Sequence, residues 1–523
     1  AERTIDFEKE RVRCLQEGRL FEDPEFPATT ESLFHEDADI RKENKAKRII
    51  WKRPGELVKE PSFHIDMEAT QFDVVQGELC DCWFLAAVQN LTARSELFYR
   101  VVPPDQSFTE NYAGIFHFQF WKDGKWVDVV VDDRLPVDRA TNKLIYSHSI
   151  SDQEFWSALL EKAYAKLYST YQHLELGKTS EAYEDFTGGI SEHRTLDQNT
   201  SKAAILEFLK RLMNGFKREA AFATSIHCEN VPAPCRSASG GIPTPDRPDG
   251  LRSNHAYSIV GISMVDTKQQ HNGKPCKTAL LRLRDPFYEG KYNGPFSKQH
   301  EAWKDIPEYE WRNLECQYKR DCGFIISVID YVRIFNRLET TFLPKSANSE
   351  IAAMLGMAYS YSSITNKRNW MAYEDPGSWC KDESNLGGPP NKSSFTKNPQ
   401  YRLSLGQGKT HLPVVVSVLQ TGRREARARN PRAILGAPGV MVYQVPCGAS
   451  LTENDRKRPP FAPGAHSKAN RQAYVEATLM PGYDYIIVPY NSFSAEAAFL
   501  LRVFSDGSCQ IKYVVTPSHP DSQ

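Results

Sequence analysis

The sequence predicts an α+β protein whose last third is an all-β sandwich. Residues 154–168 and 201–215 place apolar side chains at helical spacing, which is typical of helices that bury one face. Residues 114–136 alternate apolar and polar side chains on either side of Asp123-Gly124, which indicates a β-hairpin. Short strand-like runs separated by turn residues favour a sandwich near the C-terminus, and they lie at 413–419, 439–445, 472–479, 484–489 and 497–504.

The remaining elements follow from similar patterns. Residues 1–60 are charged with scattered apolar anchors, so we expect an arm wrapped on the surface. Residues 83–91 form an apolar helix. Residues 228–254 are rich in Pro, Gly and Ser and predict a long exposed loop, and loops of that length are uncommon unless they are functional or disordered. Two strands are expected next, at 255–261 and 277–285. Residues 321–339 are expected to form a strand followed by a helix.

Bulk properties exclude several classes of protein. The 523 residues suggest roughly three domains. A net charge of −1 gives no overall basic field for nucleic acid, and no apolar run approaches the roughly 20 residues that span a bilayer. The N-terminus has no apolar core, so we expect no signal peptide. The eleven cysteines are irregularly spaced with no CxxC pair, so we expect reduced thiols in a cytosolic protein.

One cysteine has the surroundings of a nucleophile. Cys82 directly precedes the apolar helix, and the dipole and free N–H groups at a helix start stabilise a thiolate. Gln76 lies six positions upstream, where its amide could donate to an oxyanion beside the sulfur. The alternative is a buried structural cysteine, because unpaired cysteine is among the most buried residue types.

A thiol needs a base, and the base needs an orienting acceptor. His255 begins one predicted strand and Asp285 ends the next. An antiparallel pair centred on residue 270 places these two residues opposite each other, with Tyr257 opposite Leu283 as a neighbouring pair. Taken singly, an edge histidine and a turn residue before a proline are the ordinary interpretations, so the triad of Cys82, His255 and Asp285 is a hypothesis.

Longer strings around these residues carry a specific resemblance. Residues 30–340 resemble the papain-like protease core of the calpain family, and the matching strings are Gln76-Gly77, Asp81-Cys82-Trp83 and residues 111–121, 129–136, 154–166, 184–189 and 255–258. Residues 345–515 are similar to the β-sandwich domain of that family, through residues 397–401, 481–489 and 501–505.

The resemblance implies a domain order and an activity. It implies an N-terminal arm at residues 1–29 and a protease core with two lobes. The lobe with the cysteine is residues 30–188, and the lobe with His and Asp is residues 189–340. The β-sandwich domain is residues 345–515. The resemblance also implies a calcium-modulated cytoplasmic cysteine endopeptidase that cleaves protein substrates to a limited extent. By that resemblance Cys82 is the nucleophile, His255 the base, Asp285 its orienting partner and Gln76 the oxyanion donor.

The chain departs from the family close to this chemistry. Cys80 and Asn254 stand where the family carries glycine, and Asp285-Pro286-Phe287 stands where it carries Asn-Pro-Trp. A carboxylate in place of the amide still accepts the imidazole N–H and favours the imidazolium. Glycine implies an unusual backbone conformation, which Asn tolerates better than Cys. A disulfide between Cys80 and Cys82 is conceivable, but so short a loop is strained.

Calcium ligation also differs from the family pattern. In the cysteine lobe, the family's two carboxylate ligands match Asp73 and Glu154. In the histidine lobe, the two corresponding positions are Lys291 and Lys298, and ammonium groups repel a cation, so we expect that second site to be lost. The family's penta-EF-hand domain does not occur in this chain, so we expect no dimer with the small regulatory subunit.

Two functions therefore stay open. The first is an active calcium-modulated protease, which the presence of both Cys82 and His255 favours. The second is a catalytically impaired or inactive homologue that acts by binding, which the substitutions around the site favour.

Overall fold

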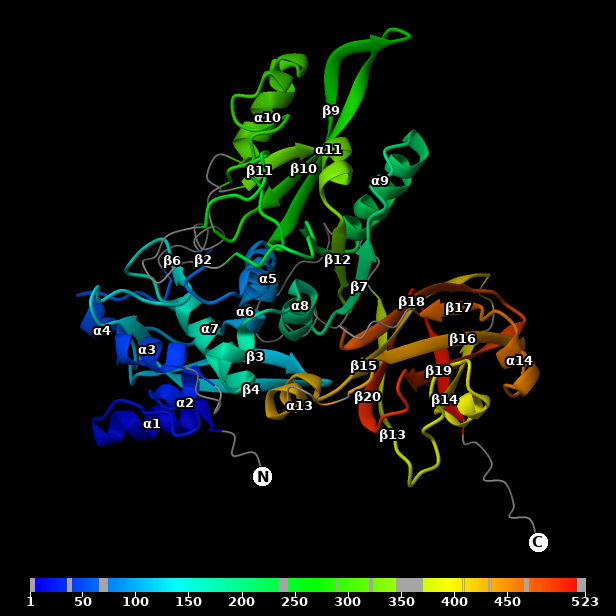
Figure 1. Cartoon of the computed structure of the whole chain (residues 1–523), viewed down its shortest axis with the longest axis horizontal. Helices are drawn as coiled ribbons and strands as arrows, with labels where there is room; N and C mark the ends of the chain where they lie inside the picture. Colours follow the sequence, from blue (N-terminus) through cyan, green and yellow to red (C-terminus); the bar gives the residue numbers. More distant parts are fainter. Residues whose placement is uncertain are drawn as a thin grey trace. The chain divides into compact units, whose positions relative to one another are not determined.

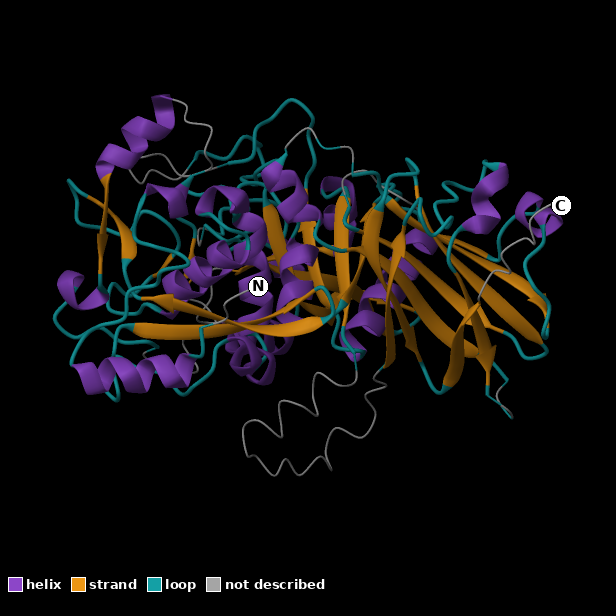
Figure 2. Ribbon diagram, turned by 90° about the horizontal axis from the view of Figure 1, so that it is seen from below, coloured by secondary structure: helices purple, strands orange, loops and turns teal. Residues whose placement is uncertain are grey.

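The structure is a computed structural model, and it describes residues 5–34, 40–64, 74–234, 243–287, 290–318, 323–344, 370–406, 408, 410–430, 433, 435–464 and 470–514. The chain divides into two compact units (Figures 1 and 2). The first comprises residues 1–121 and 126–342, and the second comprises residues 122–125 and 343–523. Among the described residues, no helix is both long and apolar enough to cross a membrane.

A fully buried helix occupies the centre of the N-terminal half of the first unit. Every residue of α5 (Cys82–Thr92) is buried, as expected for a helix with apolar groups on all sides. The other helices of this half are α1 (Phe7–Glu17), α2 (Thr30–Leu33), α3 (Ile40–Arg48), α4 (Pro54–Leu57), α6 (Ser95–Val101), α7 (Trp156–Leu167), α8 (Thr179–Thr187) and the 3₁₀ helix η2 (Tyr171–Leu174). The predicted helices at 83–91 and 154–168 are confirmed as α5 and α7.

Short strands accompany these helices. The predicted hairpin is confirmed as β3 (Ile115–Lys122) and β4 (Lys125–Asp132). Asp123 and Gly124 form its turn with φ angles of 49° and 90°, the left-handed conformation that two-residue hairpin turns require. The remaining pairs are β1 (Ile49–Lys52) with β5 (Leu135–Asp138), and β2 (Val74–Val75) with β6 (His148–Ser149).

A six-stranded sheet forms the other half of the first unit, in the order β11-β10-β9-β8-β12-β7. Its strands are β7 (Ile190–Thr195), β8 (Ala221–Ser225), β9 (Ala256–His271), β10 (Lys274–Arg284), β11 (Gly323–Ser327) and β12 (Arg337–Phe342). Its helices are α9 (Lys202–Lys217), α10 (Glu308–Tyr318), α11 (Val328–Ile334) and the 3₁₀ helix η3 (Glu301–Asp305). The predicted helix at 201–215 is confirmed as α9.

The hairpin of β9 and β10 is longer than predicted (Figure 1). The two strands meet at Asn272-Gly273, whose φ angles are 51° and 72°. The predicted strands at 255–261 and 277–285 stop short of this Asn-Gly turn. The predicted register is also wrong, because Leu283 pairs with Ile259 and not with Tyr257. The displacement is two residues at Leu283, which keeps the alternation of side chains in phase there, but a bulge between Arg282 and Leu283 increases it to three residues farther along the hairpin.

The long loop predicted at 228–254 is only partly exposed. Its described parts, residues 228–234 and 243–254, contain no helix or strand. Leu251, Arg252 and Ser253 are nevertheless buried, which corrects the expectation for the end of the loop that precedes His255.

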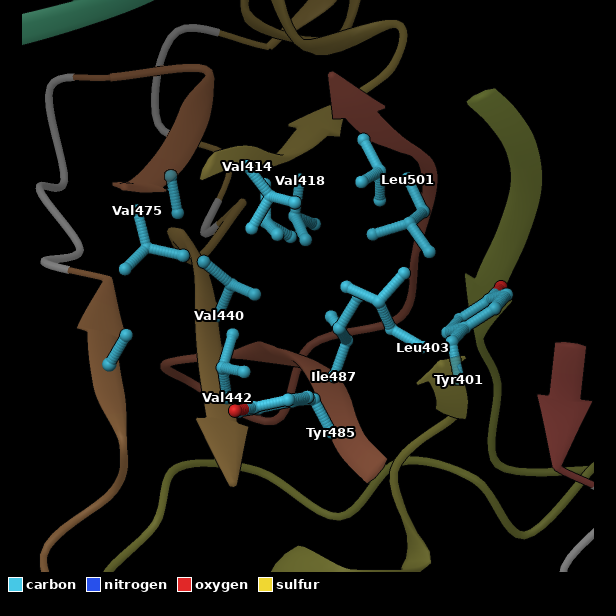
Figure 3. Close-up of a cluster of buried hydrophobic side chains, with 14 of the residues drawn as sticks. Tyr401, Leu403, Val414, Val418, Val440, Val442, Val475, Tyr485, Ile487 and Leu501 are labelled. Carbon is cyan, nitrogen blue, oxygen red and sulfur yellow. The ribbon is translucent and has the colours of Figure 1, made fainter. Parts of the chain in front are cut away.

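The second unit is a sandwich of two antiparallel sheets, ordered β13-β20-β15-β18 and β17-β16-β19-β14-β21 (Figure 2). Val414, Ile487 and Leu501 belong to the apolar core (Figure 3). The five predicted strands are confirmed as β15 (Leu412–Gln420), β16 (Pro438–Pro446), β18 (Gln472–Leu479), β19 (Tyr483–Asn491) and β20 (Ala497–Ser505). The others are β13 (Met371–Trp379), β14 (Gln400–Leu405), β17 (Ala462–Gly464) and β21 (Cys509–Val514), with helices α13 (Arg423–Arg429), α14 (Glu453–Lys457) and η5 (Ser393–Lys397).

The Asn-Gly turn generates the first prediction. Gly273→Ala adds a Cβ that meets no atom within 4 Å, so its cost is the positive φ alone. We expect the free energy of local opening of the hairpin to fall by about 1 kcal/mol, and the amides of β9 and β10 to exchange with solvent about fivefold faster. Gly55→Ala is the matched control, because a Cβ there also meets nothing but φ is not positive. Equal exchange in both variants would contradict the assigned turn.

Candidate active site

Cys82 is the first residue of α5 and is a free, buried thiol. The next helical N–H groups begin the hydrogen-bonded turn, since Phe84 N and Leu85 N donate to Asp81 O at 2.9 and 3.1 Å. The sulfur therefore lies at the positive end of the helix dipole, where a thiolate is stabilised.

The acidic neighbour of the thiol has a raised pKa. Asp81 is fully buried, and burial raises its pKa well above the ordinary value, with the Glu161 carboxylate raising it further. Both effects disfavour a negative charge on Asp81 beside Cys82.

His255 and Asp285 meet although they are not paired in the sheet register. His255 immediately precedes β9 and Asp285 immediately follows β10. His255 Nε2 donates to Asp285 Oδ1 at 2.8 Å, and the same oxygen accepts from Phe287 N at 2.9 Å. Both side chains are buried, with 0% and 3% of their side-chain surface exposed. The carboxylate thus fixes the orientation of the imidazole ring.

The buried pair is ionised. Burial by itself lowers the pKa of His255, but the charge and hydrogen bond of Asp285, together with Cys82, outweigh it and raise that pKa to about 9. Burial raises the pKa of Asp285, but the charge and hydrogen bond of His255, the Phe287 amide and Arg252 bring it below the ordinary value. At neutral pH the pair is therefore an imidazolium and a carboxylate.

The Cys82 thiol also favours the imidazolium. After Asp285, the hydrogen bond and the charge of Cys82 contribute to the raised pKa of His255, so the sulfur lies close to the ring. His255 Nδ1, the ring nitrogen that does not contact Asp285, is buried. Nδ1 is therefore the nitrogen left to serve the thiol.

Phe287 shields the imidazole from water. Its ring stacks on that of His255, with centroids 4.7 Å apart and planes 8° apart. Phe287 itself is buried. The smaller aromatic ring in place of the family's Trp still covers the His255 side of the site.

Gln76 lies at the site, but its amide has another partner. The side chain is fully buried and Nε2 donates to Leu79 O at 3.0 Å. An amide nitrogen carries two hydrogens, so one N–H stays available for an oxyanion. Gln76 N also donates to Pro286 O at 3.2 Å, which ties this loop to the residue after Asp285. The oxyanion role of Gln76 stays a prediction.

Two functional neighbours escaped the sequence analysis. Arg252 Nη1 donates to Asp285 Oδ2 at 3.3 Å from a segment expected to be exposed. Gln89 of α5 joins the halves of the site, since its Nε2 donates to Asp285 O at 3.3 Å and its Oε1 accepts from Ser258 Oγ at 3.2 Å. The sequence does not single out Arg252, because Arg284 is nearer to Asp285 along the chain and the burial of Asp285 is decided by packing.

The two glycine replacements have different structural consequences. Asn254 has a φ of 50°, so Asn occupies a left-handed position as its type allows. Its side chain accepts from Cys228 N at 3.0 Å and donates to Cys228 O at 2.6 Å. Cys80 is disulfide-bonded, whereas Cys82 is not, so the conceived bond between these two does not form. The expectation that all thiols are reduced is accordingly wrong for Cys80.

The calcium ligands can be examined only in part. Glu154 is buried, and its predicted partner Asp73 lies outside the described residues. Lys291 and Lys298 are both exposed in the histidine lobe, and their charge does not fit a cation site. Within the described ranges, no group of three His, Cys, Asp or Glu side chains could hold a metal ion.

The chain is similar in sequence to known proteins along most of its length. The family model "Calpain family cysteine protease" matches residues 21–341, and "Calpain large subunit, domain III" matches residues 375–504. The chain is 40% identical to Calpain clp-4 and 38% identical to Calpain clp-1, both of Caenorhabditis elegans, and 36% identical to Calpain-9 of Homo sapiens. Each alignment covers 96% of this chain, but only 68%, 60% and 67% of these relatives.

The ionised pair generates the second prediction. In an NMR titration of histidine side chains, we expect His255 to lose its proton near pH 9. Asp285→Asn keeps an acceptor but removes the charge, so the midpoint should fall by more than one pH unit. His117 is the internal control, since Asp105 and Asp128 raise its pKa to about 9 and neither is changed.

A linked stability change accompanies this titration. Because the folded pKa of His255 is raised, its contribution to stability is complete below the unfolded value of about 6.5 and disappears as the pH rises through 9. A midpoint that Asp285→Asn leaves unmoved would show that the carboxylate does not control the imidazole.

Proposed function

The chain belongs to the calpain family of cysteine proteases, and we propose that it is a calcium-modulated endopeptidase that hydrolyses peptide bonds in proteins. The observation that carries the proposal is the buried hydrogen bond between His255 and Asp285 beside the thiol that begins α5. The family assignment agrees with the resemblance drawn from the sequence motifs.

The residues support acyl transfer through a thioester. The Cys82 thiolate forms a bond to the carbonyl carbon of the substrate, and the carbonyl oxygen becomes an oxyanion to which Gln76 donates. The C–N bond breaks as the proton on His255 Nδ1 passes to the leaving amine. A water then attacks the thioester and gives its proton to Nδ1. The C–S bond breaks, which restores the thiolate and the imidazolium.

Asp285 suits this mechanism despite replacing an amide. Its Oδ1 accepts the Nε2 proton and so leaves Nδ1 to face the sulfur. Its charge favours the imidazolium, which is the form that protonates the leaving amine. The consequence is an enzyme whose acid form persists to about pH 9.

Substrates, calcium and location are proposed from the family. Protein substrates in the cytoplasm follow from the resemblance and are supported by the match to the protease family. Asp73 and Glu154 would supply carboxylate oxygens, the ligands that calcium prefers, in the cysteine lobe. No step of the chemistry above requires the ion. The expected role of calcium is to favour the conformation of the cysteine lobe in which Cys82 is positioned for the reaction.

One observation favours a second function, an impaired homologue that acts by binding. Cys80 is disulfide-bonded two residues before Cys82, on the stretch where the family carries glycine. A covalent link there restricts the approach of a substrate to the thiol. The intact pair of His255 and Asp285 nevertheless favours the protease.

The protease proposal generates the third prediction. We expect the protein with calcium and a thiol reductant to cleave casein, and Cys82→Ala to lower kcat at least a thousandfold because the nucleophile is lost. Cys276→Ala is the matched control, a half-buried free cysteine on β10. Cleavage is measured by release of a fluorescent fragment.

A negative result is informative when it is paired with alkylation. Mass spectrometry after brief treatment with iodoacetamide reports whether Cys82 reacts selectively over Cys276. Absence of cleavage at every calcium concentration, together with unselective alkylation, would overturn the protease proposal and support the binding function.

The calcium proposal generates the fourth prediction. Glu154→Gln removes one charged ligand, so we expect the calcium affinity measured by titration calorimetry to fall by about tenfold or more. Lys298→Ala is the matched control, because the second site is expected to be lost already and this exposed residue should not influence binding. Equal affinities in wild type and Glu154→Gln would exclude Glu154 as a ligand.

A further inference from the structure

We propose that Arg252 is a positioning residue: its buried guanidinium holds the Asp285 carboxylate charged and aimed at His255, so that an acid serves where the family carries an amide. The inference rests on the proposed function, because it concerns how this site orients its base. It assigns a role to the segment before His255, which lies outside the strings that carry the family resemblance.

The Arg252 guanidinium is buried, and its hydrogen bonds hold it toward Asp285. Only 1% of Arg252 is exposed. Its Nη1 donates to Asp285 Oδ2 at 3.3 Å, while Nε and Nη2 donate to Pro243 O at 3.2 and 2.9 Å. Arg252 N donates to the Tyr257 hydroxyl at 3.0 Å. These contacts anchor both the backbone and the head group, so the side chain cannot swing out to water.

Asp285 consequently has a different partner on each oxygen. Oδ1 accepts from His255 Nε2 and from Phe287 N, and Oδ2 accepts from Arg252. A carboxylate bonded on both oxygens cannot rotate about its last bond without breaking a contact. The direction of the His255 ring is therefore transmitted from Arg252 through Asp285.

Phe287 connects the same three groups by ring contacts. The Arg252 guanidinium carbon lies 5.0 Å from the centroid of the Phe287 ring, within the range of a cation–π interaction. The same ring stacks on His255. Phe287 thus excludes water from the ion pair and makes the charges interact more strongly.

The need for a cation follows from the charge of Asp. An Asn at this position is neutral and can be buried at modest cost, whereas a buried carboxylate requires compensation. His255 alone compensates Asp285 only while it is protonated. When His255 gives its proton to the leaving amine, Arg252 is the cation that remains beside Asp285. The ion pair of Arg252 and Asp285 thereby lets the His255 imidazole release its proton during the reaction.

Other ionisable groups lie around this pair. Cys82 is close to His255 from α5, and the Tyr257 ring contacts the imidazole edge-on from β9. Asp246 accepts from Ser253 N at 2.8 Å in the loop before His255. Arg284, at the end of β10, is buried and donates from Nη1 to Gln89 O at 3.5 Å. The hydrogen bond to Asp285 Oδ2 comes from Arg252, so Arg252 is the group to vary.

The test compares four proteins: wild type, Arg252→Met, Asp285→Asn and the double variant. We expect Arg252→Met to move the His255 titration, followed by NMR, upward by at least half a pH unit, because the carboxylate then acts on the imidazolium alone. We expect kcat at pH 7 to fall about tenfold with a smaller change in KM. Arg252→Lys should restore part of both, since it returns the positive charge.

The double variant separates charge compensation from simple support of the loop. If Arg252 serves the charge of Asp285, removing both charges leaves no buried unpaired ion, and the double variant should be closer to wild type than Arg252→Met is. If the losses of kcat in the two single variants add in the double variant, the proposal is overturned. The role of Arg252 would then be to support the loop through its hydrogen bonds to Pro243 O. An unmoved His255 titration in Arg252→Met would also overturn the proposal.

Separate controls cover a variant that does not fold and a wild-type protein that is inactive. If Arg252→Met does not fold by circular dichroism, Arg252→Lys against Arg252→Gln gives the same charge comparison with side chains that still reach Pro243 O. If wild type cleaves nothing, the proposed function fails while the His255 titration still decides the role of Arg252.

Discussion

The hydrogen bond between His255 and Asp285 is the interaction on which the site depends. It joins the residue before β9 to the residue after β10, and it is buried so completely that it can persist only as a compensated ion pair. The features around the pair compensate its charges or keep it buried. The sheet brings the two residues together, Phe287 excludes water, and Arg252 supplies the second positive charge.

The same interaction explains how the two halves of the first unit share one site. The thiol comes from α5, which is packed within the N-terminal half, while the base and its acceptor come from the sheet. Gln89 donates to the carbonyl of Asp285 itself, and Asn90 donates to Phe222 O at 3.2 Å. The helix that begins at Cys82 is therefore hydrogen-bonded directly to the sheet that carries His255 and Asp285 at the ends of its strands.

The substitutions near the site form a compatible set, with one exception. Asn254 adopts the left-handed conformation that glycine would provide, and Phe287 replaces one shielding ring by another. Asp285 brings a charge, and Arg252 compensates it. The exception is Cys80, whose disulfide has no counterpart in a glycine and lies two residues before Cys82.

Local patterns in the sequence determined much of the fold. Apolar periodicity located α5, α7 and α9, and alternation located the β3–β4 hairpin and the five principal strands of the sandwich, because burial of one face imposes a period of 3.6 or 2 on any such element. Four strands of the sandwich were not predicted, namely β13, β14, β17 and β21. Three of them, β13, β17 and β21, lie at sheet edges, where a strand is short or exposed and shows no clear alternation.

The site was predictable as a set of residues but not as a geometry. At the strand ends next to the site the register error is two residues, an even number that keeps the alternation of side chains in phase, and His255 and Asp285 meet there as expected. Arg252, Gln89 and the disulfide at Cys80 emerged only from the tertiary structure. Their partners are distant in sequence or depend on burial, and burial of a polar side chain is decided by how the chain packs rather than by its neighbours along the chain.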